Sequence, residues 1–175
     1  MRNLTAENSI ILPENLPEIE SKTFNLLDKK YLRILLLRNL IFFLLVVGAL
    51  VTFLLLTEEK PSLFITLSIS LAIVLAVAWS LAITILSFPK KGYLVREKDV
   101  SFQKGLITYK LISVPFNRIQ HVEVNQGILA KLFHLSSVKI FTAGGTSSDL
   151  SIPGLPVNDA QKLKAFLSEK ISEHE

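Results

Sequence analysis

Two uncharged runs decide the fold of this 175-residue chain: residues 40–56, LIFFLLVVGALVTFLLL, and residues 62–88, SLFITLSISLAIVLAVAWSLAITILSF. As helices rising about 1.5 Å per residue, they would be roughly 25 Å and 40 Å long, against a hydrocarbon core of about 30 Å. A helix buried in a soluble protein is rarely apolar on every face over such a length. The sequence therefore predicts two transmembrane helices, at 40–56 and 62–88, joined by a short extracytoplasmic loop at residues 57–61.

The charges that flank these runs predict how the hairpin is oriented. Lys and Arg collect on the cytoplasmic side of a membrane, and in this chain they precede the first run and follow the second. The flanking basic residues are Lys29, Lys30, Arg33, Arg38, Lys90 and Lys91. The connecting loop carries a single lysine beside two glutamates. We expect a multi-pass membrane protein with both termini in the cytoplasm and the lipid bilayer as its first partner.

Small side chains recur at every fourth residue of the second run and predict a packing ridge on that helix. The ridge consists of Ser68, Ala72, Ala76, Ser80 and Thr84. Small residues allow helix backbones to approach closely in lipid, where no hydrophobic force drives helices together. The ridge has three interpretations: ordinary small-residue usage, contact between copies in a homo-oligomer, or packing on the first helix at Gly48, Ala49 and Thr52. Neither run contains an ionisable residue, which disfavours an autonomous channel or transporter.

The chain outside the hairpin divides into three parts. Residues 1–25 contain prolines and glutamates and predict an extended N-terminal segment. Residues 26–39 mix apolar and basic side chains and predict an interfacial helical lead-in to the first transmembrane helix. Residues 89–175 differ from both, because short segments rich in β-branched and aromatic residues alternate there with Gly, Pro, Asn and Asp. This pattern predicts a small cytoplasmic domain of about six to seven antiparallel strands.

The last part of that domain predicts an amphipathic helix. Asn158 is placed as its N-cap, with Gln161 three residues later as in a capping box. The apolar side chains at helical spacing are Ala160, Leu163, Phe166, Leu167 and Ile171. One apolar helix face is suited to closing the open end of a bent sheet. The predicted fold class is α+β and membrane-bound: a transmembrane hairpin followed by an antiparallel β-barrel capped by a C-terminal helix.

Composition excludes several functional classes. The formal net charge is +4, and no basic block or basic helix is present, so the sequence does not indicate nucleic-acid binding. The absence of cysteine excludes disulfides and thiolate metal sites. No motif indicates a cofactor. The small positive excess favours weak contact with anionic lipid headgroups at most.

The stretch Val114–Gly127, VPFNRIQHVEVNQG, resembles the signature of the bacterial PH-like (pleckstrin-homology) domain family of YdbS-like membrane proteins. Supporting matches lie at 105–107, 132–133, 142–144 and 152–155. The order of two membrane helices followed by the domain also fits. The resemblance implies a PH-like barrel with a capping helix, in the bacterial cytoplasmic (inner) membrane. It implies little about biochemical activity.

In eukaryotic PH domains that bind phosphoinositides, Lys and Arg cluster around the first hairpin. Here Arg96 and Lys98 alternate with Glu97 and Asp99, so the hairpin has almost no net charge. We therefore expect weak contact with anionic lipid and no strong recognition of inositol phosphates.

The polar side chains of the signature are the candidate functional site. They are Arg118, Gln120, His121, Glu123 and Gln126. His121 and Glu123 are two residues apart on a predicted strand and share one face, and a His–carboxylate pair can serve acid–base chemistry or hold a metal. No nucleophile and no third metal ligand lies near them in the sequence. Three interpretations stay open: a polar network that fixes a corner between strands, a partner-binding surface, and catalysis.

Three hypotheses of function follow. The first is a non-enzymatic interaction module held at the inner leaflet, where an exposed sheet edge or loop recruits a protein or peptide. The second is an accessory subunit of a membrane complex that assembles through the transmembrane hairpin, with a protein partner or a second copy. The third is a hydrolase that depends on His121.

Overall fold

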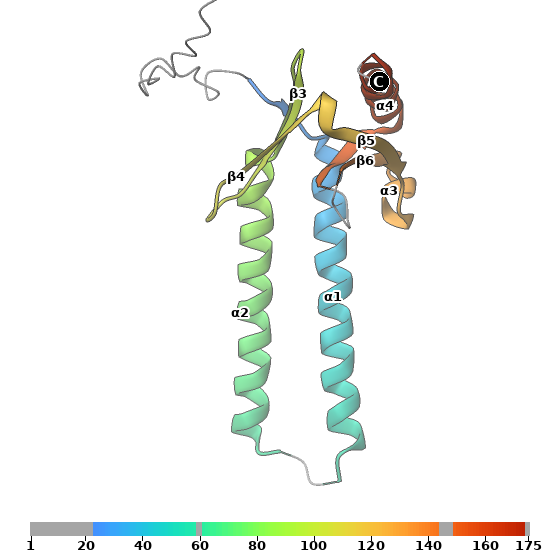
Figure 1. The fold of residues 1–175 in the computed structure, drawn as a ribbon. Coiled ribbons are helices and arrows are strands. Elements are labelled where there is room, and N and C mark those ends of the chain that lie inside the picture. Colours follow the sequence, from blue (N-terminus) through green and yellow to red (C-terminus); the bar gives the residue numbers. More distant parts are fainter. Residues whose placement is uncertain (1–22, 59–60, 144–148, 174–175) are drawn as a thin grey trace, which may run out of the picture.

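The computed structural model describes residues 23–58, 61–143 and 149–173, and it places a small domain at one end of a long helical hairpin (Figure 1). The hairpin consists of α1 (Lys29–Leu56) and α2 (Leu63–Ser87). Both helices are long and apolar enough to cross a membrane, and their most apolar windows are not buried within the chain. The predicted fold class, α+β with two long apolar helices, antiparallel strands and a C-terminal helix, is confirmed, although the described strands form two sheets and not one closed barrel. Of the predicted N-terminal segment and loop, residues 1–22 and 59–60 lie outside the described part.

The strands of the described chain form two antiparallel sheets. The first sheet contains, in spatial order, β1 (Asn25–Leu26), β2 (Gly92–Val95), β3 (Asp99–Lys104) and β4 (Lys110–Pro115). The second contains β5 (Ile119–Asn125), β6 (Leu135–Thr142) and β7 (Leu150–Pro156). The helical elements of the domain are η2 (Phe88–Lys90), η3 (Phe116–Arg118), α3 (Ile128–Leu132) and α4 (Val157–Ser172).

The first strand of the domain precedes the hairpin in sequence. β1 pairs with β2, so that Asn25 lies opposite Tyr93 and Leu26 opposite Gly92. Leu27, the next residue, is buried in the domain core. The hairpin is therefore inserted between the first two strands of the sheet, as Figure 1 shows.

This arrangement corrects two predicted boundaries. The helical lead-in expected at 26–39 begins instead at Lys29, where the Asp28 carboxylate accepts a hydrogen bond of 2.7 Å from the Lys30 backbone N–H. The domain expected at 89–175 also includes residues 25–28. A two-residue strand is too short to produce the period-two alternation by which strands are recognised in a sequence.

The first turns of α1 are packed against β7. The Asp28 N–H donates to the Gly154 carbonyl at 3.1 Å, and Ile34 and Leu35 are buried. Gly154 has a φ of 69°, and a Cβ built there would lie 2.5 Å from the Tyr31 Cγ. A glycine is thus required both by the backbone conformation and by the close approach of the tyrosine ring. These contacts join the start of α1 to β7 of the domain.

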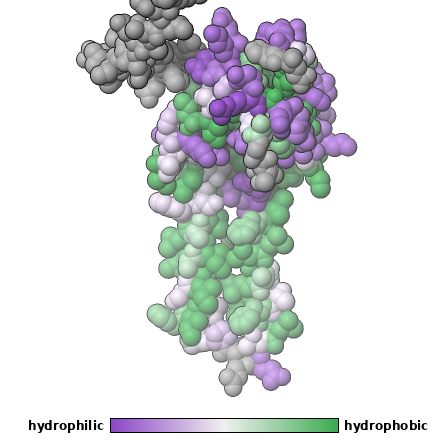
Figure 2. Space-filling view, in the orientation of Figure 1, coloured by the Kyte–Doolittle hydropathy of each residue, from purple (hydrophilic) through white to green (hydrophobic). Residues whose placement is uncertain are grey.

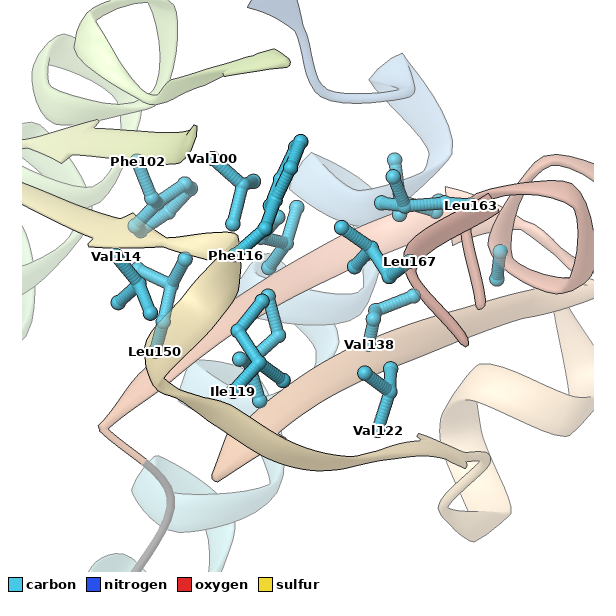
Figure 3. Packing of buried hydrophobic residues seen from close by; sticks show 14 of the residues in the cluster. Val100, Phe102, Val114, Phe116, Ile119, Val122, Val138, Leu150, Leu163 and Leu167 are labelled. Carbon is cyan, nitrogen blue, oxygen red and sulfur yellow. The ribbon is translucent and has the colours of Figure 1, made fainter. Parts of the chain in front are cut away.

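The core lies between the two sheets and α4 (Figure 3). β3 and β4 contribute side chains to this core. Phe116, in η3 between the two sheets, is only 1% exposed. α4 contributes Leu163 and Leu167, and Phe166 meets Phe116 edge-to-face with ring centroids 6.0 Å apart. The apolar face predicted for the last helix is therefore the face that covers the core.

The start of α4 differs from the prediction. The helix begins at Val157 and its N-cap is Pro156, which provides no side-chain hydrogen bond. Asn158 lies inside the first turn, so the predicted capping box is wrong. The physical reason is that β7 leads directly into the helix, and the fixed φ of proline makes the transition from extended to helical backbone without a loop.

The close approach at Gly154 generates a stability prediction. We expect Gly154→Ala to lower the free energy of unfolding by about 1–3 kcal/mol, because the left-handed φ and the Tyr31 ring both oppose a Cβ. Thermal unfolding of the full-length protein, followed by circular dichroism, measures this effect. The control is Gly127→Ala, since a Cβ at Gly127 meets nothing within 4 Å. Equal midpoints for the two variants would contradict the packing described.

Candidate functional site

The five polar residues of the predicted cluster do not form one group. The Gln126 side-chain amide donates to the Leu135 carbonyl at 2.8 Å and holds the start of α3 against β6. His121 and Glu123 share the outer face of β5, with Nε2 and Oε1 3.4 Å apart. Arg118 and Gln120 instead line a hollow at the corner between the sheets. The predicted polar network is thus reduced, in the described chain, to the single pair of His121 and Glu123.

That pair is poorly placed for catalysis. The two side chains are 55% and 51% exposed, so water screens any charge interaction between them. The His121 ring stacks on Phe141, with centroids 4.2 Å apart and the planes nearly parallel. No group of three potential metal ligands occurs in the described residues. This geometry is that of an exposed pair of side chains on the surface of β5, and it does not favour a reaction centre.

Arg118 occupies the corner where the first sheet turns into the second. Phe116, two residues earlier, is buried, and its N–H donates to the Lys98 carbonyl at 3.0 Å. This anchors η3 and leaves the Arg118 side chain outside, between two hollows. The larger hollow is about 730 Å³ and is lined by η3 with Ile119, Gln120, Ala143 and Ile171.

The second hollow, of about 370 Å³, runs along β4 and is named the β4 groove here. It is lined by Lys110, Ile112, Ser113, Val114, Pro115, Arg118, Thr142 and Asp149. β4 is the last strand of the first sheet, so in the described structure its outer backbone groups have no strand beside them. An end strand of this kind offers backbone donors and acceptors to an extended peptide.

The far wall of the β4 groove carries a fixed negative charge. The Asp149 carboxylate accepts hydrogen bonds from the Thr142 hydroxyl at 2.6 Å and from the Thr142 N–H at 2.9 Å. These bonds, the hydroxyl first, lower the pKa of Asp149 below its ordinary value. The groove therefore presents a cation at Arg118 and an anion at Asp149, beside a strand edge that no strand of the described residues covers. No pattern in the sequence indicates this groove, because the topology decides which strand ends a sheet.

The β2–β3 turn differs from a phosphoinositide site. Arg96 makes a two-point ion pair with Asp99, through Nε to Oδ1 and through Nη2 to Oδ2. The hydrogen bonds to Asp99 raise the pKa of Arg96. The Arg96 guanidinium is therefore already paired with Asp99. The turn also points away from the transmembrane helices (Figure 1).

The basic residues that flank the hairpin separate into two groups. Lys29, Lys30 and Arg33 lie in the first turns of α1, beside the domain. Lys90 and Lys91 follow α2, and the pKa of Lys91 is lowered by burial and then by the positive charges of Arg38 and Lys104. Arg38 and Lys104 therefore lie close enough to Lys91 to add positive charge beside it, where the two helices enter the domain.

The predicted small-residue ridge only partly faces α1. The Asn39 side chain bridges Ser80 and Thr84, at 3.1 Å and 3.0 Å. Ala76 lines a cleft of about 140 Å³ between the helices. Ser68 and Ala72, nearer the loop, are exposed and are not among the residues that line this cleft. A four-residue step turns roughly 40° past a full helical turn, so the ridge winds away from its neighbour.

Of the three interpretations of the ridge, packing on the first helix at Gly48, Ala49 and Thr52 is wrong. A Cβ built on Gly48 meets nothing within 4 Å, and Ala49 and Thr52 are exposed. The Thr52 hydroxyl donates instead to the Gly48 carbonyl of its own helix, at 2.8 Å. Larger side chains, among them Phe43 and Val46, line the cleft that faces α2. Size alone did not indicate which face of α1 turns inward.

The fold and its surfaces define a class: a membrane protein in which a PH-like domain is built around the base of a transmembrane hairpin. The model of the bacterial PH domain family matches residues 40–171, and the chain belongs to that family. The predicted resemblance is thereby confirmed, as is the transmembrane character of the chain.

Two relatives from Bacillus subtilis (strain 168) are similar to this chain. UPF0699 transmembrane protein YdbS is 34% identical over 102 residues, which cover 54% of this chain and 62% of YdbS. UPF0699 transmembrane protein YdbT is 24% identical over 93 residues, which cover 53% of this chain and 19% of YdbT. The matched part is therefore less than two thirds of either relative. The chain matches no solved structure.

Substitutions of Gln126 and Gln120 test whether the two side chains have different structural roles. We expect Gln126→Ala to lower the free energy of unfolding by about 1 kcal/mol, because the Leu135 carbonyl loses its donor. Gln120→Ala is the matched control, since Gln120 is exposed and has no such bond in the described structure. Thermal unfolding of both full-length variants gives the comparison. A larger loss in Gln120→Ala would contradict the division of roles.

Proposed function

We propose that this protein is a non-enzymatic interaction module anchored in the bacterial inner membrane, with the domain and both termini in the cytoplasm. The observation that carries the proposal is the insertion of the hairpin between β1 and β2, which makes the domain and its anchor one unit. Lys90 and Lys91 after the second helix support the cytoplasmic placement of the domain, since basic residues favour that side.

The β4 groove is the part of this module that we propose binds a partner. An extended peptide segment would pair with β4, while Arg118 attracts an acidic side chain of the partner and Asp149 a basic one. Because the hairpin confines the module to the membrane, weak contacts suffice for partners that are held there too. A rigidly oriented groove also loses less entropy on binding than a tethered, freely rotating domain would.

Site-specific crosslinking in native membranes tests this proposal. A photo-crosslinking amino acid is placed at Pro115 or at Arg118, both exposed and both lining the β4 groove. We expect a discrete protein adduct from each position, because a bound peptide lies against both. The same amino acid at Lys162 or Lys164, on the exposed face of α4, is the control. Adducts of equal yield at the control positions would refute the groove as the binding surface.

A charge reversal sharpens that experiment. Arg118→Glu leaves the buried corner at Phe116 intact, and we expect it to reduce the adduct formed at Pro115 several-fold. Lys164→Glu makes the same charge change on α4 and should leave the adduct unaltered.

Assembly through the hairpin is the second candidate function, and the exposure of Ser68 and Ala72 favours it. These small residues lie on the outside of α2, where another transmembrane helix has room to approach. We expect Ser68→Leu/Ala72→Leu to abolish co-purification of a membrane complex or of a second copy while the domain stays folded. Val74→Leu, at another exposed position of α2, is the control. Unchanged co-purification in the double variant would remove this candidate.

A further inference from the structure

Apart from Leu26 on β1, which is 67% exposed, the most exposed large apolar side chains of the described domain lie on two separate elements. Ile107 and Tyr109, in the turn between β3 and β4, are 80% and 59% exposed. Ile128 and Leu132, at the two ends of α3, are 91% and 69% exposed. Large apolar side chains at this level of exposure are costly in water and commonly mark a contact surface. Ile107 and Tyr109 form one apolar prong, and Ile128 and Leu132 form the other.

Both prongs lie on the side of the domain that faces the membrane. In Figure 1 the turn below the β4 label descends beside the domain end of α2, and α3 descends beside α1. Contacts between α1 and α3 confirm the second placement. Figure 2 shows hydrophobic surface at both lower margins of the domain, above the apolar helices, and smaller hydrophobic patches elsewhere on its face. The prongs therefore continue the lipid-facing surface of the hairpin on either side.

Positive charges accompany the prongs. Lys104 and Lys110 flank the β3–β4 turn, and Lys131 lies on α3; all three are exposed. Lys104 also adds to the positive charge around Lys91 and Arg38 at the base of the hairpin. Apolar side chains beside lysines, with a tyrosine among them, are the combination that the interface of an anionic bilayer accommodates.

We infer that the β3–β4 turn and α3 enter the interfacial layer of an anionic phospholipid bilayer on the two sides of the hairpin. The occupant of this surface is lipid, because the prongs are continuous with helices that are already lipid-facing. The apolar tips reach the acyl-chain boundary while the lysines meet the headgroup phosphates. The domain then rests on the membrane at three points, and this seating is independent of any partner in the β4 groove.

Single cysteines test the inference cleanly, because the chain contains no cysteine of its own. The full-length variants Ile107→Cys and Ile128→Cys are labelled with an environment-sensitive fluorophore and placed in vesicles of phosphatidylethanolamine and phosphatidylglycerol. Glu97→Cys, in the turn that points away from the helices, is the control. We expect blue-shifted emission at both prongs, and quenching about twofold or more by a nitroxide on the upper acyl chain. The label at position 97 should show neither.

Two results would overturn the inference. One is emission at position 107 or 128 that is as water-like as at position 97. The other is shielding that occurs in native membranes but not in the pure lipid vesicles, since this would assign the surface to a protein. The charge contribution is tested by Lys104→Glu/Lys131→Glu in the labelled variants. Reduced shielding in these vesicles supports headgroup contact, and unaltered shielding refutes that part of the inference.

Discussion

The structure depends on a few backbone contacts between residues that the hairpin separates in sequence. Asn25 and Leu26 pair with β2, Leu27 enters the core, and the Asp28 N–H donates to Gly154. Together they join the chain before the membrane to the chain after it. Without them α1 would be a flexible tether, and the domain would have no defined underside. Because they exist, each surface of the domain has a fixed orientation relative to the bilayer.

Two solvents shape the two halves of the molecule. In the hairpin, lipid leaves polar side chains without partners, so Asn39 is satisfied by Ser80 and Thr84, and Ser68 bonds the carbonyl of its own helix. In the domain, water drives apolar residues into a core between the sheets and α4. The exposed isoleucines of the prongs, Ile107 and Ile128, depart from the rule that holds in water. The proposed position at the boundary between the two solvents accounts for this departure.

The sequence allowed prediction wherever a single length or a single repeat determines the structure. Bilayer thickness made the two spans evident, alternation located most of β5 and β6, and the apolar face of α4 followed from helical spacing. Prediction was wrong where a contact distant in sequence decides the outcome. β1 is a strand only because β2 is beside it, and Gly48 is exposed because larger side chains of α1 face α2. The β4 groove, likewise, exists only once two sheets are placed together.

The position of the hairpin within the sheet has a consequence for how the protein is made. β1 leaves the ribosome before the two spans, and β2 leaves it after them. The sheet therefore cannot close until both helices have been synthesised, and its two edges meet only if both helices return the chain to the same side of the bilayer. A chain whose second span fails to insert would keep β1 and β2 on opposite sides of the membrane. The domain can therefore fold completely only in a chain whose two helices have both inserted into the membrane.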